Sequence, residues 1–334
     1  MNILNTSIHK IDHFNSKVEL LEEIEGKDIT EYITKLFDDI SRDKSKRRFV
    51  FRSDTTEVRS QLKEMLNGHF NKAANIIANR LLPIEINAQK EIEHLNVEIQ
   101  RGSFIQIVVE DHEFIKVILS KADHSEFLDE TDKYRLHSGL PKKKKVYKAI
   151  LINFKKDFST EQLYVYDTNA SISKYWWDSF LELNEVYTDE ENTRKSFTAI
   201  DSAIFSKIKK NYPADHTYLR NAAITYYRNR NEFDLEDFLS TTFREYKPHD
   251  PNFPVDELIR KVEELPEKKG FDLRFGIKVE EIRARIINKI MLQPGMELHL
   301  KDVDNIERVV QAGLEDDQRK FIKIYSDSGY EHFK

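Results

Sequence analysis

The chain has 334 residues, 39% hydrophobic and 34% charged with a net charge of −6, which indicates a globular protein of one or two domains with a heavily charged surface. The absence of cysteine excludes disulfides and thiolate metal sites and is typical of a reducing compartment. No window is apolar enough for a membrane span and the first residues lack a signal-peptide pattern, so we expect a cytoplasmic protein without membrane contact.

The first half of the chain predicts strands and helices in mixed order. Alternating residues in "ILNTSIHKIDHF" and "SKVELL" predict two short strands. Helical spacing predicts helices over residues 28–43, around Val58 and Leu62, and from Phe70 to a stop at Pro83. "SFIQIVVEDHEFIKVILSK" predicts a hairpin that turns at "EDHE", and "VYKAILINF" and "EQLYVYD" predict two more strands. We expect an antiparallel sheet with the first helices on one face, an α+β domain.

The second half changes from helices to strands. From about residue 171, four or five segments with one apolar side predict helices, among them "SISKYWWDSFLEL" and "PVDELIRKVEEL". The tail from Arg285 carries four short alternating runs that predict a small β-meander. The predicted organisation is an α+β domain over 1–170, a helical region over 171–270 and a β-meander over 271–334.

Four consecutive lysines form the densest cationic segment, inside "SGLPKKKKVYKAILINF". Lys142, Lys143, Lys144 and Lys145, with Lys148 nearby, are candidates to neutralise backbone phosphates without reading bases. The alternative is a solvated loop whose lysines prevent strands from pairing edge to edge.

A second cationic cluster precedes the apolar triplet "FVF". Lys46, Arg47 and Arg48 are candidates for phosphate contact, because the guanidinium fork matches phosphate oxygens. Phe49 and Phe51 stand at alternate positions, which favours the core of a short strand over stacking on an unpaired base.

Signals for an enzyme are weak. The sequence has no G-x-G-x-x-G, P-loop, H-E-x-x-H or G-x-S-x-G pattern. Acidic residues surround His112, so a divalent-metal nuclease using Asp111 and Glu113 is one alternative, although solvation of a turn explains these residues more simply. We expect no cofactor, no bound metal and no catalytic reaction.

Several stretches resemble the bacterial nucleoid-associated protein family NdpA. They are the opening "SIHKIDHF", the hairpin "FIQIVVEDHEFIKVILSK", the pair "YDTNASISKYWWDSFLEL" and "ENTRKSFTAI", and the C-terminal "FPVDELIRKVEELPEKKGFDLRFGI" with "RKFIKIYSDSGYEHF". The resemblance covers nearly the whole chain, and residues 122–145 depart from it. It implies a cytoplasmic protein of the nucleoid that associates with double-stranded DNA and has no enzymatic reaction.

The sequence therefore predicts a non-enzymatic protein that contacts the DNA phosphate backbone with little sequence specificity. The acidic net charge favours one alternative, an adaptor that meets DNA through a protein partner such as a topoisomerase or a phage-defence complex. The helical middle is a candidate surface for a protein partner or a homodimer, with Trp177 as a candidate interface residue, while Trp176 and Phe180 are expected in the core.

Overall fold

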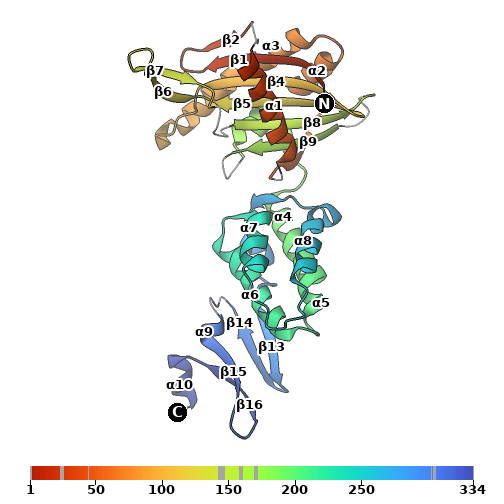
Figure 1. Ribbon diagram of the computed structural model, residues 1–334, viewed down its shortest axis with the longest axis vertical. Helices are drawn as coiled ribbons and strands as arrows, with labels where there is room; N and C mark the ends of the chain where they lie inside the picture. Colours follow the sequence, from red (N-terminus) through yellow and green to blue (C-terminus); the bar gives the residue numbers. More distant parts are fainter. Residues whose placement is uncertain are drawn as a thin grey trace. The chain divides into compact units, whose positions relative to one another are not determined.

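An eight-stranded antiparallel sheet organises the first of two compact units, residues 1–188, in the computed structural model. The structure describes residues 2–22, 26–43, 45–141, 147–157, 161–168, 172–301, 303 and 306–333, with the backbone alone at residues 147, 161, 288 and 307. The strand order is β10-β3-β9-β8-β5-β4-β1-β2 (Figure 1). The strands are β1 (Asn2–Asp12), β2 (Lys17–Leu20), β3 (Arg47–Phe51), β4 (Gly102–Asp111), β5 (Phe114–Asp123), β8 (Tyr147–Lys155), β9 (Glu161–Asp167) and β10 (Leu183–Glu185).

Helices cover both faces of this sheet. Successive side chains of a strand point to opposite faces, so Phe104 and Val108 of β4 contact one helical layer while Ile105 and Ile107 contact the other. Helices α2 and α3 form the first layer and α1 the second (Figure 1). The prediction of a single covered face is therefore wrong, because an amphipathic pattern does not say which face of a sheet a helix will cover. The helices are α1 (Lys27–Arg42), α2 (Glu57–Leu66) and α3 (Phe70–Ile92).

Helix α3 continues through Pro83, where the sequence predicted its end. A proline inside a helix removes one main-chain hydrogen bond and costs about 3 kcal/mol. Beyond the proline, Glu85 and Ala88 are buried. The packing of this second half of α3 offsets the local cost, which the sequence pattern around the proline does not reveal.

A separate hairpin occupies part of the stretch that departs from the family pattern. Strands β6 (Ser125–Asp129) and β7 (Arg135–Gly139) pair only with each other among the described strands. Their apolar side chains remain open to solvent: Leu128 is 61% exposed and its cross-strand partner Leu136 is 63% exposed. The hairpin thus presents apolar surface that no described part of the chain covers.

The second compact unit, residues 189–334, begins with helices around an aromatic core. Phe233 stacks on Phe275 with ring centroids 4.8 Å apart, which joins the two short strands of this unit that carry them. π-Helical segments extend α4 over residues 201–205 and α7 over residues 240–244. The elements are α4 (Asp189–Ile200), α5 (Ser206–Ile208), α6 (Pro213–Asn229), β11 (Glu232–Asp234), α7 (Leu235–Leu239), α8 (Val255–Lys269) and β12 (Arg274–Gly276).

The C-terminal strands pair as two hairpins rather than as one continuous meander. The run "IERVVQA" was predicted to be a strand, but its first four residues form a helical turn and pairing begins at Val310. A short helix, α10, follows the last strand. The elements are β13 (Asn288–Gln293), β14 (Met296–Leu300), α9 (Ile306–Val309), β15 (Val310–Leu314), β16 (Lys320–Ile324) and α10 (Asp327–Phe333).

The mixed α+β class predicted from the sequence is confirmed. The stretch 171–188 belongs to the first unit, because Trp176, Phe180 and Leu183 are part of the core that α2 and α3 cover. The predicted division into 1–170, 171–270 and 271–334 remains a prediction, and the contacts divide the chain into units 1–188 and 189–334. Within the described residues, every helix is too short or too polar to cross a bilayer.

Candidate nucleic-acid interface

The lysine run Lys142, Lys143, Lys144 and Lys145 lies outside the described residues. The structure fixes only its two ends: β7 finishes at Gly139, and β8 starts at Tyr147 in the interior of the sheet. The run therefore connects the exposed β6–β7 hairpin to the sheet. Its contact with DNA stays a prediction.

Lys148 follows the run but belongs to the interior of the first unit. It is 8% exposed, and its Nζ lies 3.9 Å from Oδ1 of Asp167, its cross-strand partner on β9. Asp167 also accepts hydrogen bonds from the backbone N–H of Ser173 at 3.0 Å and from its hydroxyl at 2.9 Å. The structure therefore gives Lys148 an ion-pairing role within the fold.

Lys46 closes the end of helix α1. Its Nζ donates to the carbonyl oxygens of Ile40 at 3.1 Å and Ser41 at 2.6 Å, in the last turn of α1. These carbonyls have no partner inside the helix, and a cation there also complements the helix dipole. Burial lowers the pKa of Lys46, which is consistent with an ammonium group partly withdrawn from water.

Arg47 and Arg48 bind the end of β10 and the residues that follow it. Arg47 Nη2 lies 2.8 Å from Oε1 of Glu185 and donates to the carbonyl oxygen of Tyr187 at 3.3 Å. The guanidinium carbon of Arg48 lies 4.7 Å from the centroid of the Tyr187 ring, a cation–π contact. Both side chains hold residues 185–187 at the edge of the sheet.

The interpretation of Phe49 and Phe51 as core positions of a short strand is confirmed. Phe49 is 2% exposed and Phe51 is 9% exposed, while Val50 between them is 47% exposed. Trp177, a candidate for a partner interface, packs against Phe49 with ring centroids 5.4 Å apart. The alternating pattern of this strand was readable from the sequence, but the partners of the cations beside it were not.

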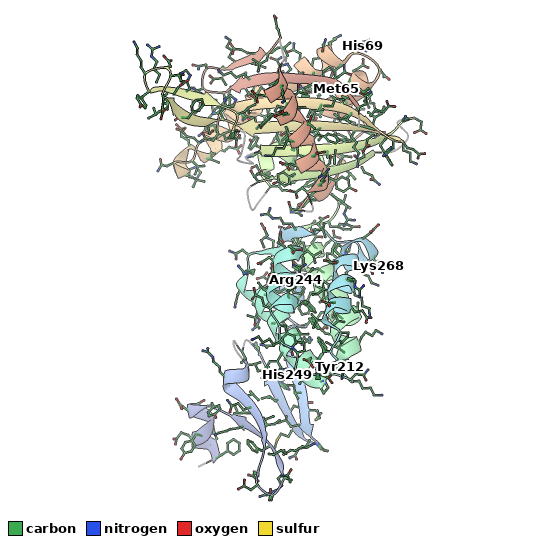
Figure 2. All side chains as sticks on the ribbon, viewed as in Figure 1. Met65, His69, Tyr212, Arg244, His249 and Lys268 are labelled. Carbon is green, nitrogen blue, oxygen red and sulfur yellow. The ribbon has the colours of Figure 1, made fainter. Side chains whose placement is uncertain are left out.

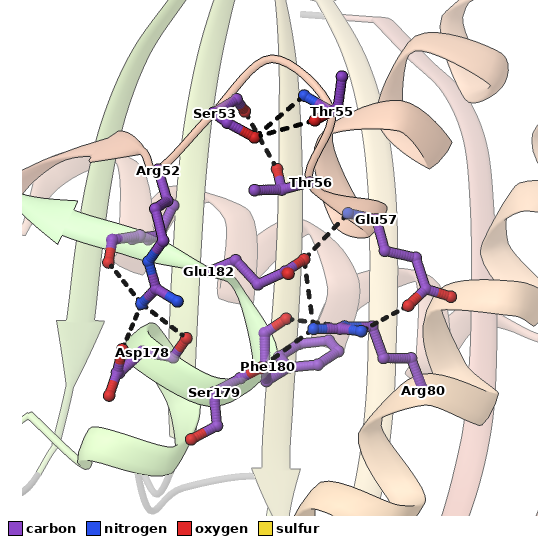
Figure 3. Close-up of polar contacts among 11 residues, drawn as sticks. Arg52, Ser53, Thr55, Thr56, Glu57, Arg80, Asp178, Ser179, Phe180 and Glu182 are labelled. Carbon is purple, nitrogen blue, oxygen red and sulfur yellow. Dashed lines mark hydrogen bonds and ion pairs between the residues drawn. The ribbon is translucent and has the colours of Figure 1, made fainter.

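Two further arginines form a network that sequence reasoning did not single out (Figure 3). Arg80 of α3 donates to the carbonyl oxygens of Ser179 and Phe180, at 3.1 Å each, and pairs with Glu57 and Glu182. Arg52 pairs with the carboxylate of Asp178 in the same way. The network fastens residues 178–182 to α2, α3 and β3. Arg80 and the carbonyl groups of Ser179 and Phe180 lie about a hundred residues apart in the chain, so no local pattern reveals these contacts.

Two of the three carboxylates of the "EDHE" turn, those of Glu110 and Asp111, are bound by a lysine. Lys116 Nζ donates to Oδ2 of Asp111 at 2.6 Å, and Lys156 Nζ donates to Oε1 of Glu110 at 2.8 Å. The pKa of Asp111 is lowered by the hydrogen bond from Lys116. Across the parts of the chain that the structure describes, no three His, Asp or Glu side chains converge as metal ligands would. The geometry of this turn gives the nuclease alternative no support.

A buried charged group lies at the other end of the β4–β5 pair. Lys121 and Glu85 are both fully buried, with Nζ 2.7 Å from Oε1, and Lys121 also donates to the carbonyl oxygen of Gln100. His13 Nδ1 lies 3.8 Å from Oε2 of Glu85, and burial lowers the pKa of His13. Both ring nitrogens of His13 are buried without a hydrogen-bond partner among the described residues.

The chain thus folds as an α+β protein. Its described candidate cations, Lys46, Arg47, Arg48 and Lys148, each contact other groups of the protein. Residues 7–309 match the family model described as Nucleoid-associated protein YejK. The chain therefore belongs to this nucleoid-associated protein family, and the resemblance inferred from the sequence is confirmed. A search of curated proteins finds no match.

Proposed function

We propose that the chain binds duplex DNA directly through the phosphate backbone, with little sequence specificity and without a catalytic reaction. Membership of the nucleoid-associated family over residues 7–309 is the observation that carries this proposal. The protein would then act on the chromosome, in the nucleoid of the cytoplasm.

The distribution of cations supports the lysine run as the contact. Lys46, Arg47 and Lys148 bind groups of the protein itself, so their charge is already offset within the fold. Four adjacent lysines at 142–145 concentrate positive charge in a chain whose net charge is −6. An acidic remainder limits DNA contact to one face, and lysine contacts to phosphate carry no base preference. Arg48 contacts the Tyr187 ring within the fold and is therefore a weaker candidate than the run.

Duplex binding across a salt series tests the proposal. Each phosphate contact contributes about 0.9 to the slope of log affinity against log salt. Changing Lys142–Lys145 to glutamate should therefore reduce the slope by about 3 to 4 and weaken binding at every salt concentration. Two unrelated duplex sequences should bind equally well.

A matched control carries the same change of charge elsewhere. Lys35, Lys207, Lys209 and Lys210 are exposed, and changing these four to glutamate should leave the slope unchanged. An equal loss in both variants would show that net charge alone governs binding, and would overturn the assignment of the contact to the run.

A protein-interaction adaptor is the second candidate function. The acidic net charge and the apolar surface of the β6–β7 hairpin, where Phe127 is 51% exposed, favour a protein partner or a second copy of this chain. If the wild type does not bind duplex DNA at low salt, the proposal of direct contact is wrong and the adaptor role replaces it. The mass of the protein in solution would show whether the partner is a second copy of this chain.

A further inference from the structure

The second unit contains a cavity of about 720 Å³ between α6, the segment 241–249 and α9. Its volume lies within the range of about 300–1,000 Å³ that holds small organic ligands. Figure 2 shows His249 at the end of the helical part, and Ile306 of α9 lines the same cavity. None of the sequence motifs pointed to this place, because its walls come from segments up to ninety residues apart.

Aromatic rings form much of the wall. Tyr218, Tyr226 and Tyr246 line the cavity, and the ring of Tyr218 stacks on His249 at 4.5 Å with an angle of 12° between the planes. Flat, electron-rich surfaces of this kind favour a planar ring as the ligand.

The aromatic wall is held rigidly from behind by one buried carboxylate. Asp215 is 1% exposed and accepts hydrogen bonds from the Tyr246 hydroxyl and from the backbone N–H of His249, both at 2.7 Å. Because the Tyr246 proton goes to Asp215, its oxygen accepts from Nδ1 of His249 at 3.1 Å. Both rings are therefore fixed before any ligand arrives, which lowers the entropy cost of binding.

The charge of the lining selects an anion. Among the described residues that line the cavity, Arg230 and Lys247 are cationic and none carries a carboxylate. The whole chain has more acidic residues, 59, than basic residues, 53. The lining of the cavity has the opposite balance of charge. Arg230 Nη2 lies 3.7 Å from Oδ2 of Asp237, and its guanidinium carbon lies 5.8 Å from the Tyr226 ring. The carboxylate offsets part of the charge of Arg230, so Lys247 contributes the larger share of the attraction for an anion.

A buried hydroxyl in the wall lacks a partner. Thr242 is 2% exposed, and its Oγ1 makes no hydrogen bond within the described structure. Burying a hydroxyl without a partner is unfavourable, and such a group in a native protein calls for an explanation, for example a bound water, ion or ligand. A ligand with a polar ring edge would satisfy it.

We propose that this cavity binds a single unpaired nucleotide. The base stacks against the tyrosines, the phosphate meets Lys247 and Arg230, and the Thr242 hydroxyl bonds to a polar group of the ligand. The nucleotide comes either from solution as a free mononucleotide or from an unpaired position in a DNA strand. This site does not depend on the duplex contact proposed above.

Calorimetry on the full chain distinguishes the two sources. The probes are AMP, adenosine, inorganic phosphate, a twelve-nucleotide single strand and the corresponding duplex. AMP should bind more tightly than adenosine or phosphate alone, since both parts of the nucleotide contribute. If the single strand binds and AMP does not, the nucleotide comes from an unpaired position in a DNA strand. That result would support the site equally well.

Two pairs of variants separate binding from folding. Thr242→Val should weaken binding about five- to tenfold without lowering the thermal midpoint, because it removes a hydroxyl that has no partner in the fold. Thr217→Val, outside the cavity, should leave binding unchanged. Lys247→Ala should weaken AMP binding and Lys210→Ala should not, although both lysines are exposed.

A larger side chain in the wall provides the remaining check. Ala222→Trp fills the cavity from α6 and should abolish binding. The inference is overturned if neither AMP nor the single strand binds the wild type. It is also overturned if the two ligands bind Ala222→Trp and Thr242→Val as tightly as they bind the wild type. The duplex titration is independent of this result, so the proposed function survives or fails separately.

Discussion

Lys121 and Glu85 form an ion pair that is withdrawn from solvent on both sides, with Nζ 2.7 Å from Oε1 and neither side chain exposed. The pair links β5 to α3 on the face of the sheet that α2 and α3 cover. Burial raises the pKa of Glu85, and the Lys121 ammonium opposes that shift. Two buried charges are tolerated here because each compensates the other.

Removing one partner of this pair should destabilise the protein strongly. Lys121→Met leaves Glu85 buried without a counter-ion, and we expect the free energy of unfolding to fall by about 3–5 kcal/mol. The double variant Lys121→Met, Glu85→Leu should recover much of that loss, because an apolar pair avoids the cost of desolvating charge. Denaturant unfolding of the three proteins measures both quantities.

An exposed ion pair provides the control for that experiment. Lys268 on α8 (Figure 2) lies 2.5 Å from Glu264, with side chains 63% and 56% exposed. Lys268→Met should cost no more than about 0.5 kcal/mol. A loss at Lys121 as small as this one would mean that the buried pair contributes little.

Protonation of His216 should make stability depend on pH. Burial, with Arg220 and Lys209 adding to it, lowers the pKa of His216 to about 4, against 6.5 for an ordinary histidine. The unfolded chain then binds more protons between these two values, so the free energy of unfolding rises with pH through this window. The contribution is complete above about pH 6.5 and disappears as the pH falls towards 4, with an upper limit of about 3 kcal/mol.

His216→Gln isolates this contribution from those of other histidines. Chemical unfolding of the wild type and the variant between pH 4 and 7 should show a flatter pH dependence in the variant. His94→Gln replaces an exposed histidine and should leave the dependence as it is. If the wild type and His216→Gln show the same pH dependence, His216 does not contribute to it.

Replacing Pro83 should stabilise the protein. Its side chain is exposed in the middle of α3, and its ring removes a main-chain hydrogen bond there. We expect Pro83→Ala to raise the free energy of unfolding by about 1–3 kcal/mol, after the greater freedom of the unfolded chain is taken into account. Thermal and denaturant unfolding both measure the change.

Pro213 offers the contrasting position. It stands in the first turn of α6, where a proline costs no hydrogen bond and its fixed φ suits the helix. Pro213→Ala should be neutral or slightly destabilising. An equal gain at both positions would contradict the explanation based on the lost hydrogen bond.

Elements with a strong local period were predictable. The hairpin around "EDHE" appears as β4 and β5 because long alternating apolar runs leave one favourable register. Helix α8 follows the spacing of Leu258, Val262 and Leu265, all buried. The length of α3 was not predictable, since packing beyond Pro83 outweighs a local penalty.

The cationic candidates show a similar division. The sequence identifies Lys46, Arg47, Arg48 and Lys148 as charged, but their partners come from the end of α1, from residues 185–187 and from β9. A charge that already has such a partner in the fold is less available to DNA than one without a partner. That condition depends on contacts between distant segments.

The sequence by itself determined the α+β class, most strands and helices and the family, because these depend on periodic patterns and on the order of elements along the chain. Only the tertiary structure decided which face each helix covers, which cations are neutralised within the fold, and that three tyrosines, two cations and a buried hydroxyl line one cavity. Those facts rest on the meeting of segments far apart in the chain, and local spacing carries no information about such meetings.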